Sequence, residues 1–252
     1  MSSLLPALLT SLAATSSPAV LITEIMYDPA SPERKGEPEW VEIANLGPTP
    51  VDLSGWKLDD EDSADWGLLD GSLKAGGVAI LINGDAATRE DFLEAWTDDP
   101  DAEVGYLVIP VSWGSLANKP SETNEVLQLL DADAHVICEV NYGRGKGWPD
   151  PGRRGQSIYL KQLDPGSASE AANWSLTEKD MEGSRVASGK VVYIKADIGS
   201  PGYLPTGEAQ PSPTPPAPPP AQKAPTAPPP PEKPREPAPP PPPTEDEDDI
   251  PY

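Results

Sequence analysis

The chain has 252 residues and a formal net charge of −23 at pH 7. Twenty of its 35 prolines and none of its 21 glycines lie in residues 209–252, which predicts a globular part followed by a Pro-rich tail. The acidity argues against nucleic acid as a partner, because phosphate binding needs clustered Lys and Arg. No apolar run approaches the roughly 18 residues that a membrane-spanning helix needs.

Residues 1–19 have the features of an export signal. They carry no charged side chain, and a short stretch rich in Leu and Ala precedes small residues that permit cleavage after Ala13 or Ala19. No Lys or Arg precedes the apolar stretch, so a disordered extension is the alternative interpretation. No cysteine stands directly after the stretch, which argues against a lipoprotein anchor. We expect the protein to be secreted or held at the cell surface.

Short apolar segments recur through the globular part, between turns rich in Gly, Pro and Asp. Residues 20–27 and 39–45 alternate as half-buried strands do, whereas 77–83 is almost continuously apolar and predicts a strand covered on both faces. The other predicted strands are 50–56, 56–60, 105–111, 125–131, 135–142 and 157–163, and 191–195 is a late strand candidate. About nine such strands predict an all-β fold of the β-sandwich class.

One segment interrupts the strand pattern. Residues 85–96 predict a short helix that Asp85 or Thr88 could cap. Phe92, Leu93 and Trp96 would share one face of that helix, so we expect this face to pack on the sandwich.

Several short motifs stand in order along the globular part. ITEIMYDP, EWVEIAN and DLSGW come first, and GVAILIN, NEVLQLLDADAHVICEVNYG, the WP pair at 148–149, SIYL, NW and GSPG follow. This ordered set resembles the lamin-tail domain, found at the end of nuclear lamins and in many secreted bacterial proteins. The resemblance implies an immunoglobulin-like β-sandwich over residues 20–204 with one short inserted helix. It also implies a binding or structural role without catalytic residues.

The chain departs from the pattern of that family in three places. The family usually has glycine where Asn124 stands, and Asn tolerates the left-handed conformation. It often has glycine where Ala134 stands. A positive φ would cost alanine about 1 kcal/mol, so we expect the hairpin connection Asp131–Ala134 to use another turn type. Residues 184–195 lengthen the C-terminal region.

Catalytic and metal-binding patterns are scarce. His135 and Cys138, the only residues of their kinds, are three apart on a predicted strand and point to opposite faces, so they form no local dyad. An acidic run offers oxygen ligands of the kind that Ca²⁺ takes. Its members are Asp59, Asp60, Glu61, Asp62 and Asp65. A solvated acidic loop is the alternative, and no other cofactor is predicted.

The seven tryptophans divide into two groups. Four of them fall in the motifs that match the family, which predicts a packing role: Trp40, Trp56, Trp148 and Trp174. The other three are candidates for an exposed sugar-binding platform: Trp66, Trp96 and Trp113.

The sequence therefore predicts a non-enzymatic extracellular or surface module that serves interaction or structure. Its partner would be a protein or a surface polysaccharide, and the chain's charge argues against the chromatin role of animal lamin tails. Residues 205–252 would be a disordered Pro-rich spacer with an acidic end. The alternative is a calcium-binding or carbohydrate-binding accessory domain associated with a secreted hydrolase.

Overall fold

A computed structural model describes residues 19–30, 38–60, 66–101, 103–116, 125–143, 145–152, 155–164, 166–189, 192–193 and 196–205. One α-helix, α1 (Arg89–Trp96), and one turn of 3₁₀ helix, η1 (Ala171–Asn173), lie in this part. Its strands are β1 (Val20–Met26), β2 (Trp40–Asn45), β3 (Val51–Asp52), β4 (Lys57–Asp60), β5 (Ser72–Leu73), β6 (Val78–Asn83), β7 (Leu107–Val111), β8 (Glu125–Leu130), β9 (Val136–Tyr142), β10 (Ile158–Leu160), β11 (Trp174–Leu176), β12 (Arg185–Val186) and β13 (Ile198–Gly199). No helix in these ranges is long and apolar enough to span a bilayer.

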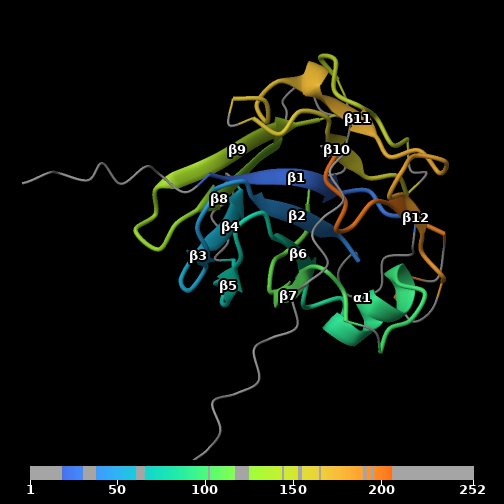
Figure 1. Cartoon of the computed structure of the whole chain (residues 1–252). Helices are drawn as coiled ribbons and strands as arrows, with labels where there is room; N and C mark the ends of the chain where they lie inside the picture. The colour runs from blue at the N-terminus through green and yellow to red at the C-terminus, as the bar shows by residue number, and fades with distance from the viewer. Residues whose placement is uncertain are drawn as a thin grey trace, which may run out of the picture. The chain divides into compact units, whose positions relative to one another are not determined.

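The strands form a large sheet, a smaller sheet and two short ribbons (Figure 1). The large sheet has the order β11-β10-β1-β2-β6-β7, and the smaller one has the order β4-β8-β9. Within these two sheets every pair is antiparallel except β6 with β7. The all-β fold class is therefore confirmed, with a single short helix as predicted.

The main core lies between the two sheets. It joins apolar side chains from β1, β2 and β6 on one side to those of β4, β8 and β9 on the other. A register shift between Ile22 and Glu24 marks an irregularity in β1, so Ile22 joins this core while Glu24 turns to the other face of the large sheet. A β-bulge has this effect because it breaks the strict alternation of side chains.

A second core covers the outer face of the large sheet. Trp40 of β2 meets Phe92 and Trp96 of α1 at ring-centroid distances of 6.1 and 5.5 Å, and Tyr193 packs on both helix residues. Every residue of β1, β2 and β6 is consequently buried. The prediction of a doubly covered strand at 77–83 is confirmed. The strands expected at 20–27 and 39–45 are present, but the expectation that they are half-buried is wrong. The second core covers the outer face of the sheet, so both of their faces are buried.

The helix begins later than the predicted segment. Thr88 is its N-cap: the Thr88 hydroxyl accepts the Asp91 N–H at 3.1 Å, and the Asp91 carboxylate accepts the Thr88 N–H at 3.0 Å. This reciprocal pair is a capping box, which favours a helix start at Arg89. The predicted face of Phe92, Leu93 and Trp96 is buried.

The C-terminal region differs most from the prediction. The described residues of the expected strand 191–195 are Val192 and Tyr193, and neither lies in a strand. The short strands β5, β11, β12 and β13 were not predicted, because two or three residues are too few to display a period. Tertiary pairing rather than local pattern forms them.

The turn between β8 and β9 corrects a further expectation. Ala134 adopts φ 63°, so the hairpin uses the left-handed conformation although the residue is not glycine. Its N–H donates to the Asp131 carbonyl at 3.0 Å, and the Asp131 N–H donates to the His135 carbonyl at 3.0 Å. The expectation of another turn type is wrong, since these bonds hold the turn in place. Asn124 lies outside the described residues.

Candidate functional site

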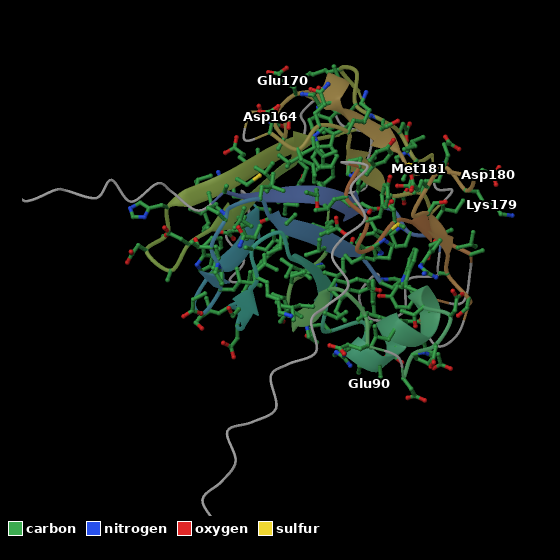
Figure 2. All side chains as sticks on the ribbon, viewed as in Figure 1. Glu90, Asp164, Glu170, Lys179, Asp180 and Met181 are labelled. Carbon is green, nitrogen blue, oxygen red and sulfur yellow. The ribbon has the colours of Figure 1, made fainter. Side chains whose placement is uncertain are left out.

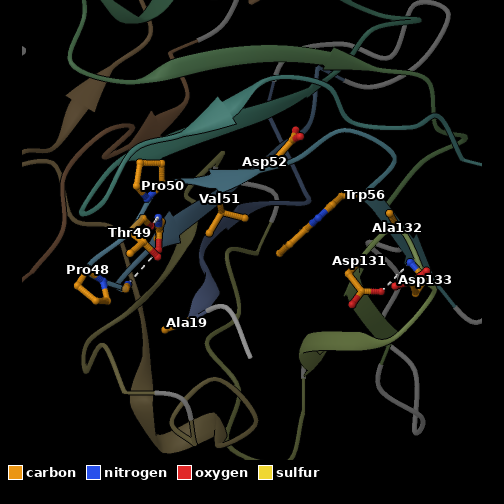
Figure 3. A pocket seen from close by; sticks show the side chains of 12 residues that line it. Ala19, Pro48, Thr49, Pro50, Val51, Asp52, Trp56, Asp131, Ala132 and Asp133 are labelled. Carbon is orange, nitrogen blue, oxygen red and sulfur yellow. Dashed lines mark hydrogen bonds between the residues drawn. The ribbon is translucent and has the colours of Figure 1, made fainter. Parts of the chain in front are cut away.

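An open hollow of about 440 Å³ lies where the β2–β3 loop and the β8–β9 turn of the sandwich meet the start of β1. We call it the loop-end pocket. Its walls come from residues 47–52 and from the turn 131–133, with Ala19 at the start of β1 and the ring of Trp56 between the loops (Figure 3). Loops at the end of a rigid sandwich are common places for binding sites, because the strands position them without constraining their sequence.

A buried amide fixes one wall of the loop-end pocket. The Asn45 side chain is fully buried, and its Nδ2 donates to the carbonyls of Thr49 at 2.8 Å and Lys74 at 3.0 Å. Its Oδ1 accepts the Gly47 N–H at 2.9 Å. The same Nδ2 also donates to the Leu73 carbonyl at 3.2 Å. Because one side chain serves four backbone groups, the loop from β2 to β3 is preformed.

Two carboxylates of the pocket are held in turns. Asp131 accepts the N–H groups of Asp133 and His135, both at 2.9 Å, and Asp52 accepts the Ser54 hydroxyl at 2.6 Å. Hydrogen bonding to these charged forms lowers the pKa of Asp131 and of Asp52 below the ordinary value. The residues that line the pocket include no His, Cys, Ser or Lys. The lining thus combines two prolines and a Trp ring with carboxylates, a surface on which a ligand can dock.

The tryptophans do not form an exposed platform. All seven are buried, none with more than 8 % of its surface exposed. Trp66 stacks on Trp113 with ring centroids 5.8 Å apart, and the Trp113 Nε1 donates to the buried Glu39 carboxylate at 3.0 Å. Trp96 packs on Trp40 in the second core. The prediction of a sugar-binding platform at Trp66, Trp96 and Trp113 is wrong, because aromatic packing buries all three rings.

The acidic run is only partly described. Asp59 and Asp60 lie in β4, while Glu61, Asp62 and Asp65 lie outside the described residues. Asp59 Oδ2 lies 3.0 Å from Lys57 Nζ, and Asp60 is buried with Leu58 on the other face of the strand. Among the described residues, no three His, Cys, Asp or Glu side chains gather as a metal site would need. Calcium binding by this run stays a prediction.

The histidine and the cysteine lie apart, as predicted. Cys138 faces the main core with Val140, and its Sγ accepts the Ile22 N–H at 3.4 Å. Burial raises the pKa of the thiol to about 11. His135 is exposed and contacts Asp131 through Nδ1 at 3.1 Å. The thiol is therefore protonated at neutral pH and takes the place of a small apolar side chain.

Two fully buried glutamates on neighbouring strands were missed by sequence reasoning. Glu24 of β1 is the register partner of Glu42 of β2, and both lie on the outer face of the large sheet. Burial raises the pKa of both, and the negative charge of Glu24 raises that of Glu42 further. Alternation alone assigned these positions to a solvated face, although the second glutamate of EWVEI is one of them.

These two glutamates bind residues 200–202, near the end of the described domain, to the large sheet. Glu24 accepts the Ser200 N–H and the Ser200 hydroxyl, both at 2.7 Å, and it also accepts the Ser157 hydroxyl. Glu42 accepts the Gly202 N–H and the Thr23 hydroxyl, both at 2.7 Å. Donors from distant parts of the chain replace water around the two carboxylates. The glutamate pair therefore has a structural role, since its carboxylates bond to the protein's own donors and are buried away from solvent.

Residues 13–144 match the family model described as Lamin Tail Domain. The chain belongs to the lamin-tail domain family. The match spans β1 to β9, which include both walls of the loop-end pocket. A search of curated proteins found no match. The lamin-tail domain is an immunoglobulin-like module, which agrees with the two packed sheets and with a role in interaction or structure.

Proposed function

We propose that this lamin-tail domain is a non-enzymatic interaction module that works outside the cell or on its surface, with residues 205–252 as a Pro-rich spacer. The observation that carries the proposal is the preformed loop-end pocket. One wall is held by hydrogen bonds from the buried Asn45 side chain, so binding costs little ordering of that loop. Prolines and the edge of Trp56 supply apolar contact, and aspartates supply charge at the rim.

The alternatives have less support. The carbohydrate-binding alternative depended on exposed tryptophans, and all seven are buried. The calcium-binding alternative depends on the acidic run from Asp59 to Asp65, of which residues 61–65 lie outside the described part of the chain. The export proposal rests on the composition of residues 1–19, and N-terminal sequencing of protein recovered outside the cell tests it. A chain found there with Met1 intact would contradict removal of a signal.

A pocket-filling variant tests the interaction module. Thr49→Arg places a long side chain in the loop-end pocket while keeping the backbone carbonyl that Asn45 binds. The matched control is Ala172→Arg, at an exposed position in η1 outside the pocket lining. We expect Thr49→Arg to lower the cell-associated fraction of the exported protein, relative to the fraction in the medium, and the control to leave it unchanged. Equal retention of both variants would contradict a docking role for the pocket.

A further inference from the structure

A second hollow, of about 530 Å³, lies between the loop after α1 and the C-terminal part of the domain. Residues 97–99 and 103–106 form one side, and Gly183, Arg185 and residues 201–203 form the other. We call it the insertion groove. It shares no lining residue with the loop-end pocket. Figure 1 shows α1 at the lower right and the β8–β9 hairpin of the loop-end pocket at the upper left.

Two tyrosines give the insertion groove flat aromatic walls. The ring of Tyr106 lies directly on Gly202, and the ring of Tyr203 lies directly on Gly183, where a Cβ atom would overlap each ring. Gly183 also has φ +77°, which favours glycine at this position. Burial raises the pKa of Tyr106 to about 12, so the ring remains neutral. Close packing on backbone holds both rings in one orientation.

Carboxylates dominate the rim. Asp98, Asp99 and Glu103 line the groove, and Arg185 is the one basic residue in its lining. Glu103 also lines two adjoining hollows, of about 130 and 540 Å³. Glu90, Glu94 and Asp101 outnumber Arg89 in the larger one, and Lys74 lines the smaller one. The acidic surface is thus longer than a single small cation would need, and it fits an extended segment.

The groove already holds one guanidinium at its edge. Arg185 Nη1 lies 3.1 Å from Asp98 Oδ2, and the pair is exposed. The positive charge of Arg185 acts on Tyr106, since it lowers the pKa that burial raises. Arginine suits such a surface because its planar group stacks on an aromatic face and donates in a fork to carboxylates. Asp99 and Glu103 offer the same chemistry to a second guanidinium.

We propose that the insertion groove binds an arginine-bearing segment of a basic protein partner. This proposal goes beyond the interaction module assigned to the loop-end pocket, since it concerns a different surface and names the chemistry of the partner. Guanidinium groups of the partner stack on Tyr106 or Tyr203 and pair with Asp99 and Glu103. The chain's net charge of −23 steers a basic segment toward the domain but gives no preference for this face.

A synthetic eight-residue peptide of alternating Arg and Gly, titrated against the full chain by fluorescence anisotropy, tests the proposal. The groove variant combines Asp99→Asn with Glu103→Gln, and the asparagine side chain keeps an oxygen for the bond from the Asp101 N–H. The control combines Asp164→Asn with Glu170→Gln and so has the same net charge. Figure 2 shows Asp164 and Glu170 at the top of the view, far from Glu90 of α1 at the bottom.

We expect the groove variant to bind the peptide at least about fivefold more weakly than the unchanged chain, and the control to bind within about twofold of it. A peptide of alternating Lys and Gly should bind the unchanged chain more weakly than the Arg peptide, because an ammonium does not stack as a guanidinium does. Equal losses in the two variants would overturn the proposal, since binding would then follow net charge alone. Equal affinity for the Lys and Arg peptides, or no binding to the unchanged chain, would overturn it as well.

Discussion

At the scale of single residues, the buried pair of Glu24 and Glu42 constrains the fold, because each carboxylate needs donors from the chain. Glu24 and Glu42 have hydroxyl and backbone N–H donors but lie side by side in a fully buried layer. A charged carboxylate in such a place needs several donors to replace its water, and a second charge beside it is unfavourable. The Glu42 proton is therefore held at a pH where an exposed glutamate has lost its own.

Stability should fall as the pH rises. A raised pKa means that the native state binds a proton which the unfolded chain has released, so unfolding becomes easier from about the ordinary value of 4.5 up to the raised one. Each unit of that rise corresponds to about 1.4 kcal/mol. Urea unfolding at pH 5 and pH 8 measures the loss. Glu42→Gln should flatten this dependence because it removes the charge, whereas the exposed control Glu170→Gln should keep it. An unchanged slope in Glu42→Gln would contradict the buried charge as the cause.

Ala134 stores strain in the β8–β9 turn. Its φ of 63° is comfortable for glycine and unfavourable for alanine. We expect Ala134→Gly to stabilise the domain by about 1 kcal/mol, which raises the melting temperature by roughly 2–4 °C in a protein of this size. Ala132→Gly in the same turn is the control and should give no rise, because Ala132 does not adopt a positive φ. Calorimetry on both variants would show whether relief of strain or added flexibility dominates.

At the scale of elements, β13 depends on the aromatic layer beneath it. A Cβ atom on Gly199 would stand 2.6 Å from Trp40 Cζ2 and 3.2 Å from Trp96 Cζ3. Neither ring can move freely, since each packs on Phe92 and on the other. The strand therefore lies as close to the large sheet as the backbone permits.

Gly199→Ala should destabilise the domain by about 1–3 kcal/mol, the usual cost of overpacking. The control is Gly105→Ala, where a Cβ atom would meet nothing within 4 Å and φ is not positive. Chemical unfolding followed by tryptophan fluorescence measures both. A Gly199→Ala variant as stable as its control would mean that the C-terminal segment can shift away from Trp40 at little cost.

At the scale of the whole molecule, the composition of residues 205–252 predicts a spacer that adds nothing to the core. Within residues 209–252, Ile250 and Tyr252 are the only large apolar side chains, so the segment cannot bury enough surface to offset its ordering entropy. We expect deletion of residues 206–252 to leave the melting temperature within about 1 °C, since such a segment contributes no packing energy. Limited proteolysis should remove the same segment first. A deletion that unfolds the domain would contradict the spacer.

Local pattern determined most of the sandwich. Alternation and apolar runs predicted β1, β2, β6, β8 and β9, because long strands display their period and short turns separate them. The buried helix face was also accessible, since it depends only on the geometry of one element, and so was the separation of His135 from Cys138, although His135 lies in the turn before β9. The ordered motifs indicated the family, which the match to residues 13–144 confirmed.

Tertiary structure alone decided what covers the outer face of the large sheet. The sequence marks Glu24 and Glu42 as polar and therefore solvated, whereas both are fully buried and residues 200–202 supply backbone and hydroxyl donors to them. Trp96 lies in the second core, and Trp66 and Trp113 stack on each other in the main core, which removed the expected platform. Both candidate surfaces arise in the same way, because each unites loops more than 50 residues apart. A local period records which face of a strand is polar, but only the packing of distant segments determines whether that face meets water.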